Sequence, residues 1–382
     1  MRLRRPGRGP LVVVAGVLAL FTAAAFAASD SNQAGIALAP DTSRSGPEKA
    51  AGQQQGTASS QEPAGPTVAL AFAGDMHFEL NLAALLDHPR GALGPITSTL
   101  READLTMVNL ESTIGHRGSP EAKELEVPAL RYHFRTSPAA LDLLDVAGID
   151  VASLANNHGA DYGRLGLVDT LRAIRRSPIP VLGIGHNQRA AFTPYRVTVR
   201  GITFAYFAAD ASFREGASSV WAAGPATPGI ASARVARPRV LLDAVRTASD
   251  RDDVVVVYMH WGKERRSCPT AKQRTTALAL AEAGADIIVG SHAHVLLGSG
   301  WLGDAYVSYG LGNFLWYHNH QPDTGVLQLQ VRDGAVVEDA LVPARIKTSG
   351  LPNPLRGKQR AAAVAEWRAL RGCAGLASRP PS

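Results

Sequence analysis

The sequence predicts an α/β domain with a mixed sheet system that helices cover on both sides. From Thr67 to about Ala344, short apolar runs alternate with segments of helical periodicity. The runs at 254–259 and 287–289 are apolar throughout, which is typical of strands buried on both faces. Two other segments have the pattern of β-hairpins, which add antiparallel strands.

The first half of the domain contains three predicted strands, each followed by helical segments. A glycine, Gly148, is predicted to stop the third helix. The strands are predicted at 67–75, 104–112 and 149–158, and the helices at 80–86, 96–101, 138–147 and 166–176.

The second half begins and ends with predicted hairpins, whose turns are Arg200-Gly201 and Asp333-Gly334. Gly284 is predicted to stop the helix before the strand at 286–290. The remaining predictions are hairpins at 195–209 and 325–342, strands at 253–261 and 305–310, and helices at 240–248, 271–283 and near 361–370.

The N-terminal residues 1–28 are predicted to direct the protein out of the cytoplasm. They combine a basic start with an apolar run of 18 residues that ends near Ala25-Phe26-Ala27, an A-x-A cleavage pattern. A secretory signal peptide fits this pattern, and an uncleaved membrane anchor is the alternative, because the run is just long enough to span a bilayer. Either segment predicts an exported protein that is extracellular or held at the cell surface.

Three further segments complete the predicted organisation. Residues 29–66 are small, polar and rich in Pro and Gly, which predicts a disordered linker. Residues 67–345 are predicted to form the domain. Residues 346–382 are basic and Ala-rich, and they are predicted to form a C-terminal tail with a short helix.

Charge and cysteine content restrict the classes of function. The net charge is +6, but four arginines and no acid lie in residues 1–28, which leaves +2 for the rest. No basic stripe interleaved with aromatic residues is present, so we do not expect nucleic acid as a partner. The two cysteines, Cys268 and Cys373, could form one disulfide in an oxidising compartment, or they could be two separate thiols.

Polar side chains follow five predicted strands at their C-terminal ends. In open α/β sheets the ligand crevice lies outside these ends, so we expect the side chains to converge although they span more than 200 positions. They are Asp75, His77, Asn109, Glu111, Asn156, Asn157, His158, His260, His292 and His294.

This set of residue types predicts a metal centre. Imidazole, carboxylate and amide ligands without thiolate suit a divalent ion such as Mn, Zn or Fe. The ligands exceed the needs of one ion, so two ions about 3.5–4 Å apart and bridged by a carboxylate are predicted. Such a pair activates a water molecule at neutral pH and holds the oxygens of a phosphoryl or carbonyl group, while a histidine outside the metal shell could protonate the leaving group.

The motifs resemble those of a known family over roughly Val68 to Ala344. They are GDMHFE at 74, DLTMVNLEST at 104, FRTSP at 134, LANNHGADYG at 154, HWGKE at 260, GADIIVGSHAHV at 284 and YGLGNF at 309. In order and spacing this set resembles the CapA proteins of poly-γ-glutamate capsule synthesis, which belong to the calcineurin-like metallophosphoesterase superfamily. The resemblance implies a four-layer α/β/β/α sandwich with mixed sheets.

The resemblance also implies roles for the residues at the strand ends. His158 corresponds to the general acid or substrate-binding histidine. The implied metal ligands are Asp75, His77 and His294 for the first ion, Glu111 as the bridging carboxylate, and Asn157, His260 and His292 for the second ion.

The sequence departs from the family pattern at four points of this set. Glu111 stands where an aspartate is usual, and Gly159 follows His158 where an acidic residue is usual, although Asp161 is close by. The sequence GSHAH differs from GHHPH through Ser291 and Ala293, and Gly310 stands where serine is common.

Several further residues are candidates for contacts with substrate. Arg135 could bind an anionic group or could be an ordinary surface arginine, and Asn109 lies among the polar strand ends. Glu264 could hold a metal-binding histidine or be solvated. A second H-x-H pair, His318 and His320, follows an apolar run in a predicted loop, and we expect these two histidines not to bind metal.

The combined reading is an exported protein that makes, anchors or trims poly-γ-glutamate or a related anionic envelope polymer. The leading hypothesis is a dinuclear metal-dependent hydrolase that acts on a phosphoester or on an amide bond of the polymer. The alternative is a non-catalytic, metal-stabilised component of a membrane-associated complex for polymer synthesis or export. The expected partners are therefore the polymer or a phosphoester substrate and such a complex.

Overall fold

The computed structural model describes residues 65–381, except 125, 213–219 and 252–253. The predicted signal peptide or anchor and nearly all of the predicted linker lie outside these residues. Within the described ranges, no helix is both long enough and apolar enough to cross a membrane.

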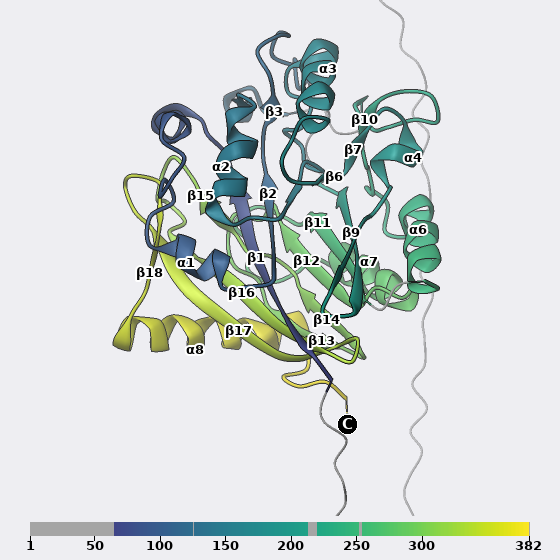
Figure 1. Cartoon of the computed structure of the whole chain (residues 1–382), viewed down its shortest axis with the longest axis vertical. Coiled ribbons are helices and arrows are strands. Elements are labelled where there is room, and N and C mark those ends of the chain that lie inside the picture. The colour runs from purple at the N-terminus through teal and green to yellow at the C-terminus, as the bar shows by residue number, and fades with distance from the viewer. Residues whose placement is uncertain (1–64, 125, 213–219, 252–253, 382) are drawn as a thin grey trace, which may run out of the picture. The chain divides into compact units, whose positions relative to one another are not determined.

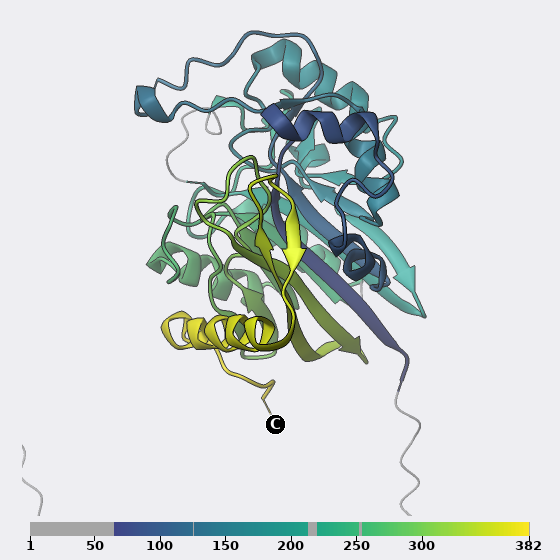
Figure 2. The same ribbon diagram turned by 90° about the vertical axis from the view of Figure 1, so that its left-hand side faces the viewer.

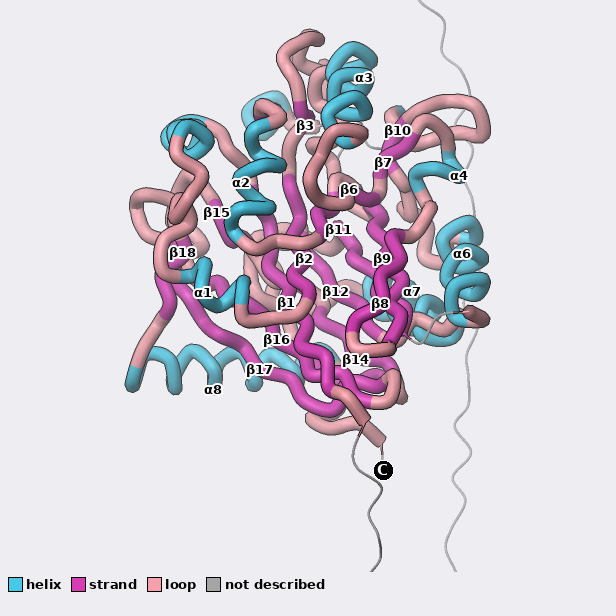
Figure 3. The backbone as a smooth tube through the Cα atoms, viewed as in Figure 1, coloured by secondary structure: helices cyan, strands magenta, loops and turns pink. Residues whose placement is uncertain are grey.

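Two large mixed sheets form the centre of the domain, as Figures 1 and 3 show. The first sheet has the strand order β18-β17-β16-β1-β2-β5-β6, and β15 pairs with β1 beyond this path. The strands β1, β2, β5 and β6 are parallel, whereas β16 pairs with β1 in the antiparallel direction. The bounds are β1 Thr67–Met76, β2 Leu105–Leu110, β5 Val151–Ser153, β6 Val181–Leu182, β15 Asn313–Leu315, β16 Asp323–Arg332, β17 Ala335–Ile346 and β18 Pro352–Pro354.

The second sheet has the order β13-β14-β12-β11-β9-β8. Its four central strands are parallel, and β13 and β8 add antiparallel edges through hairpins. Two short pairs, β3 with β4 and β7 with β10, lie outside both sheets. The bounds are β8 Tyr195–Val199, β9 Ile202–Asp210, β11 Val254–His260, β12 Ile287–Ser291, β13 Ser299–Leu302, β14 Ala305–Ser308, β3 Thr113–Ile114, β4 Arg135–Thr136, β7 Ile184–Gly185 and β10 Gly229–Ile230.

The two sheets pack face to face, because their strands alternate between two buried faces. In β1, Leu70 and Phe72 join Tyr258 of β11 in the cluster between the sheets, whereas Ala71 and Ala73 belong to the cluster under the helices. The hydroxyl of Tyr258 donates to the carbonyl of Ala73 at 2.8 Å, which links one sheet to the other.

Helices cover the outer face of each sheet, which completes the predicted four layers. Helices α1, α2 and α3 pack on the first sheet, and α6 and α7 on the second (Figure 1). In α6 the buried residues Leu241, Leu242, Val245 and Ala248 recur at helical spacing. The bounds are α1 Ile96–Arg101, α2 Ala139–Ala147, α3 Gly163–Ile174, α4 Gln188–Ala191, α6 Arg239–Ser249, α7 Ala271–Glu282 and α8 Gly357–Ala374, with 3₁₀ helices η1 Leu80–Asp87 and η2 Pro128–Leu130.

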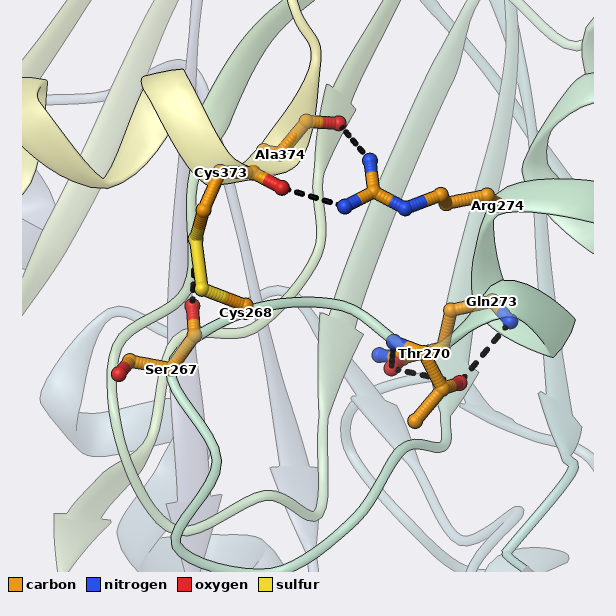
Figure 4. The surroundings of a disulfide bond; sticks show 7 residues. All are labelled: Ser267, Cys268, Thr270, Gln273, Arg274, Cys373 and Ala374. Atoms are coloured by element: carbon orange, nitrogen blue, oxygen red, sulfur yellow. Dashed lines mark hydrogen bonds between the residues drawn. A yellow bond between two sulfur atoms is a disulfide. The ribbon is translucent and has the colours of Figure 1, made fainter.

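The C-terminal segment is part of the domain, which extends beyond the predicted boundary at residue 345. Strand β18 joins the first sheet, and α8, the yellow helix in Figure 2, packs against β17 and β13. Helix α8 has 18 residues and buries Trp367. A disulfide joins Cys268 to Cys373 near the end of α8, and Arg274 of α7 donates to the carbonyls of Cys373 and Ala374 (Figure 4).

Candidate metal centre

The strand β1 delivers Asp75 to the edge where the two sheets meet. The backbone N–H of Asp75 donates to the carbonyl of Gly312 at 2.9 Å, and Asp75 pairs with Asn313 of β15. A Cβ at Gly74 would lie 1.9 Å from the carbonyl oxygen of Gly312, so only glycine permits this approach of the two chains. Gly74 is therefore a structural requirement for the position of Asp75.

The carboxylate of Asp75 is fully buried and is bonded to both sheets. One oxygen accepts a hydrogen bond from the side-chain amide of Asn109 at 2.8 Å, on β2 of the first sheet. The other accepts from the backbone N–H of His292 at 2.9 Å, directly after β12 of the second sheet. Asn156 in turn donates to the amide oxygen of Asn109 at 3.0 Å. The side chain of Asn109, predicted to contact substrate, is therefore hydrogen-bonded to Asp75 and Asn156.

Asp75, Glu111 and His260 are all buried, and each offers one ligand atom such that the three atoms lie within 4.8 Å of one another. Around Nε2 of His260 lie the amide oxygen of Asn157 at 2.7 Å, Nδ1 of His292 at 3.0 Å and a carboxylate oxygen of Glu111 at 3.5 Å. Ligands that share one divalent ion at about 2.1 Å have similar separations of roughly 3.0–3.4 Å. The donor set therefore fits a divalent metal.

The two histidines of the GSHAH segment, His292 and His294, point in different directions because of the turn that follows β12. His292 and His294 have left-handed backbone, with φ of +88° and +57°. Nδ1 of His292 faces His260, whereas Nδ1 of His294 lies 2.8 Å from the amide oxygen of Asn313 and 3.7 Å from Asp75. The two histidines therefore have different neighbours, and their division between two metal ions stays a prediction.

A serine that departs from the family pattern orients His260. The hydroxyl of Ser291 lies 3.0 Å from Nδ1 of His260, which turns Nε2 of the ring toward Asn157 and His292. Burial and the neighbouring histidines hold the pKa of His260 well below its usual value. The ring is therefore neutral at pH 7, as metal binding requires.

His158 lies beside this cluster and is oriented by an acid three residues later. Its Nδ1 is 2.6 Å from a carboxylate oxygen of Asp161, and its Nε2 is 3.9 Å from Glu111. The ring stacks on Phe134 with 4.1 Å between centroids. Asp161 thus supplies the acid that is absent at Gly159, where a Cβ would lie 2.7 Å from the carbonyl oxygen of Leu154.

A buried lysine completes this arrangement. The ammonium of Lys123 lies 2.8 Å from the second oxygen of Asp161 and donates to the carbonyl of Tyr132 at 2.7 Å. Burial raises the pKa of Asp161 to about 6, while Lys123 favours its charged form. Asp161 is therefore predominantly ionised at pH 7 and accepts a hydrogen bond from the Nδ1–H of His158. The unprotonated Nε2 of His158 then faces Glu111.

The structure places His77 apart from the three closest ligand atoms. Its Nδ1 is 3.1 Å from the backbone N–H of Glu79, and its Nε2 is 3.4 Å from that of Tyr317. The ring stacks on Phe134 and meets Trp316 edge-on. A neutral imidazole accepts from only one of these two N–H groups, because its other nitrogen carries the ring proton. The ring packs among Phe134, Trp316 and Tyr317, and the role of His77 as a metal ligand stays a prediction.

Arg135 and Glu264 have different positions relative to the centre. The guanidinium of Arg135 donates to the carbonyls of His116 and Gly118 and lies 3.4 Å from the ring centroid of Tyr162, so it braces the chain. Glu264 lines the cavity that also contains Asn157, His158 and His294, and it lines a second cavity that reaches His292.

The sequence did not single out Lys123 or Phe134 as parts of the site. Lys123 lies in the segment 115–133, where no strand or helix pattern predicts burial. Phe134 and Asn313 lie in two segments that carry the family resemblance, FRTSP and YGLGNF. Their place in these motifs is the feature of the sequence that could have identified them as residues of the site.

Comparison with known proteins places the chain in a family. The profile of the family described as "Bacterial capsule synthesis protein PGA_cap" matches residues 69–318. A capsule biosynthesis protein CapA of Bacillus anthracis is 32% identical over 229 residues, which cover 58% of this chain and 54% of that protein. A PGA biosynthesis protein CapA of Bacillus subtilis (strain 168) is 30% identical over 239 residues, which cover 62% and 58%.

The matched region thus spans little more than half of each Bacillus relative. A solved structure described as a candidate 5′-nucleotidase of Staphylococcus aureus, in complex with alpha-ketoglutarate, aligns with a TM-score of 0.46 and 17% identity. That alignment covers 80% of this chain and 58% of the other, and at this score it establishes no functional relationship. On the strength of the profile match, which covers more than half of its length, this chain belongs to the bacterial capsule synthesis protein family PGA_cap.

Proposed function

We propose that the protein is a metal-dependent hydrolase that acts on an anionic polymer of the cell envelope. The observation that carries this proposal is the buried group of Asp75, Glu111 and His260, with His158 oriented beside it by Asp161. His158 faces the predicted ligand Glu111 but is not one of the three residues whose ligand atoms lie closest together. A metal site that only stabilised the fold would not require a histidine held in this orientation. A hydrolase uses such a histidine to move a proton.

The metal ligands in this proposal are the residues whose donor atoms lie around His260 and around Asp75. Divalent ions bound there would activate a water molecule and polarise the bond to be broken. The proposed ligands are Asp75, Glu111, Asn157, His260, His292 and His294.

His158 moves a proton at Nε2 in this proposal. Its Nδ1 proton is held by Asp161, so Nε2 is the nitrogen that exchanges protons with water or the leaving group. Burial holds the pKa of His158 well below its usual value, and the ring is neutral before reaction. The Asp161 carboxylate stabilises the imidazolium that forms when Nε2 takes up a proton.

The substrate class rests on the family and on the relatives. The two Bacillus relatives are described as capsule and PGA biosynthesis proteins, and we extend to this chain a role with an envelope polymer. Export, and a location outside the cytoplasm, rest on the basic and apolar pattern of residues 1–28. The bond that is cleaved is proposed to be an amide of the polymer or a phosphoester.

The test combines metal analysis with a search for turnover by the purified protein. We expect a divalent metal in the protein, and hydrolysis of γ-glutamyl polymer or of bis(p-nitrophenyl) phosphate that stops on chelation. A protein that binds metal but hydrolyses neither compound would contradict the proposal. It would favour the non-catalytic component of a polymer synthesis complex.

A further inference from the structure

Left-handed backbone is concentrated around the candidate metal centre. Among the described residues, seven non-glycine residues have positive φ, and four of them, Lys123, Arg265, His292 and His294, lie at this centre or line its cavity. Such backbone costs energy at non-glycine residues and gathers where a side chain must be aimed at a particular place. For Lys123, His292 and His294 the contacts above supply the reason, but for Arg265 they do not.

The backbone of Arg265 is fastened directly to the metal-binding turn. Its φ is +59°, and its N–H donates to the carbonyl of Ala293 at 2.8 Å, between His292 and His294. The next residue, Arg266, closes a turn on Lys263 through a 3.2 Å hydrogen bond. The position of Arg265 is thus set by the same turn that sets the two histidines.

The other end of the loop is fixed as well. Cys268 is disulfide-bonded to Cys373 of α8, and the side chains of Thr270 and Gln273 form a capping box at the start of α7 (Figure 4). The segment between His260 and Ala271 is therefore held at both ends and in its middle. A long side chain on this segment starts from a defined point.

The guanidinium of Arg265 is available at the mouth of the centre. The side chain is exposed, and it lines the cavity that contains Asn157, His158 and His294. Within the described part of the chain, no hydrogen bond or ion pair engages the guanidinium. Burial is the main cause that lowers the pKa of His318, and the charge of this guanidinium adds to it. Glu126 and Glu264 line the same cavity, and their charge disfavours an anion on their part of the wall.

We propose that Arg265 binds an anionic group of the substrate next to the bond that reacts at the metal centre. This inference rests on the proposed function and adds a specificity-determining residue to it. The planar guanidinium fork matches the two oxygens of a carboxylate or of a phosphate, whereas a lysine ammonium does not. The ligand chemistry is therefore an oxyanion, carried either by a carboxylate side group or by a phosphodiester chain.

The experiment measures binding by fluorescence anisotropy with labelled oligomers of two kinds. One probe is fluorescein-labelled penta-γ-glutamate, and the other is a labelled glycerol phosphate oligomer of matched net charge. A γ-linked penta-isoglutamine with an amidated C-terminus, in which the pendant α-carboxylates are amides, serves as the neutral reference. Arg265→Gln removes the charge, Arg265→Lys keeps the charge without the fork, and Arg266→Gln is the control on the neighbouring residue, which does not line the cavity.

We expect Arg265→Gln to weaken binding of one anionic probe by roughly tenfold, as the loss of a charge-assisted hydrogen bond does. Arg265→Lys should recover only part of this loss, and the neutral probe and the Arg266→Gln protein should be unaffected. Weaker binding of the γ-glutamate probe alone identifies a carboxylate side group as the ligand of Arg265. Weaker binding of the glycerol phosphate probe alone identifies a phosphodiester chain. Equal weakening by Arg266→Gln, or no weakening by Arg265→Gln for either probe, overturns the proposal.

Hydrolysis of the same probes, measured in parallel, separates this inference from the proposed function. Binding that depends on Arg265 without hydrolysis refutes the enzyme and retains the anion site. Hydrolysis whose KM is unchanged in Arg265→Gln retains the enzyme and refutes the anion site. Thermal unfolding of each variant verifies that the exposed substitution leaves the fold intact.

Discussion

The chain contains two H-x-H pairs of the same pattern, and the structure treats them differently. His292 and His294 follow the buried strand β12, and their ring nitrogens face His260 and the amide oxygen of Asn313. Their neighbours are other potential ligands or groups that orient ligands. This pair lies where the ends of several parallel strands converge.

The second pair, His318 and His320, lies in the loop after β15. Nε2 of His318 accepts from the indole N–H of Trp316 at 3.3 Å, and its Nδ1 faces the backbone N–H of His320 at 3.3 Å. The neighbours of His318 are thus a tryptophan ring and the backbone of its own loop, and its neutral ring accepts from only one of the two N–H groups. From this difference we expect an H-x-H pair to bind metal only where a strand end places it beside other potential ligands.

The largest expected effect is the loss of metal from the first pair. His292→Ala removes a nitrogen 3.0 Å from His260, and we expect it to lower metal content and to abolish most turnover. The melting temperature should fall as well, because a ligand that binds only the native state stabilises it. Elemental analysis and thermal unfolding measure both without a substrate.

His320→Ala is the matched control from the second pair. Its metal content and melting temperature should equal those of the unmodified protein. If the two alanine variants lose equal amounts of metal, the distinction between the pairs is wrong.

A second test uses a histidine that lies beside the ligands but is held by an acid. His158→Ala should retain its metal and lose roughly 10²–10⁴-fold in turnover, the usual contribution of general acid–base catalysis. This variant would then differ from His292→Ala because it keeps its metal, and from His320→Ala because it loses turnover. If His158→Ala empties the site as His292→Ala does, then His158 is a ligand and its proposed proton transfer fails.

The third test concerns the charge pair that supports His158. Lys123→Met leaves the Asp161 carboxylate buried without its cation, and breaking a buried ion pair costs roughly 3–5 kcal/mol of unfolding free energy. Denaturant unfolding measures this loss. The double variant Lys123→Met, Asp161→Asn should recover much of it, and a double variant as unstable as the single one would show that packing, not charge, dominates.

The smallest expected effect is the pH dependence of the metal-free protein. Burial, as the largest cause, lowers the pKa of His77, His158 and His260, so below about pH 6.5 the unfolded chain binds more protons than the native one. The unfolding free energy should therefore fall as pH falls from about 6.5. Each histidine contributes at most about 1.4 kcal/mol per pH unit.

Asp161 and Asp286 oppose this trend below about pH 6, because burial raises the pKa of each to about 6 and the native state then gains protons. The fall should accordingly be steepest just below pH 6.5. Denaturant unfolding of chelator-treated protein at pH 7.5, 6.5 and 6.0 measures it, and a stability that is unchanged or rises across this range would contradict the burial of the histidines.

Apolar runs and glycine stops are local signals, and they predicted the α/β class and most of the central strands, whereas the four-layer packing was implied by the family resemblance. Helix α7 and the first hairpin occur within a residue of their predicted positions, whereas the second hairpin begins two residues earlier and ends four residues later than predicted. The sequence did not predict that 80–87 forms a 3₁₀ helix or that α8 extends over Gly357–Ala374, since α8 is stabilised by β17, β13 and the disulfide.

The site was predictable to the extent that strand ends converge. Asp75, Glu111 and His260 gather as parallel topology dictates. The aromatic setting of His77 depends on Phe134, Trp316 and Tyr317, and the burial of Lys123 depends on Asp161 and Tyr132. These contacts join segments with no common periodicity, so no local pattern announces them.

The two hydrogen bonds of the Asp75 carboxylate have a consequence for how the protein folds. Asp75 and His292 are 217 positions apart, so their bond forms only after a long loop has closed and the sheets have docked. A chain in which either sheet is still unformed cannot present the complete ligand set. Metal uptake should therefore be a late event in folding, and the rate at which refolding protein acquires metal would report the docking of the two halves.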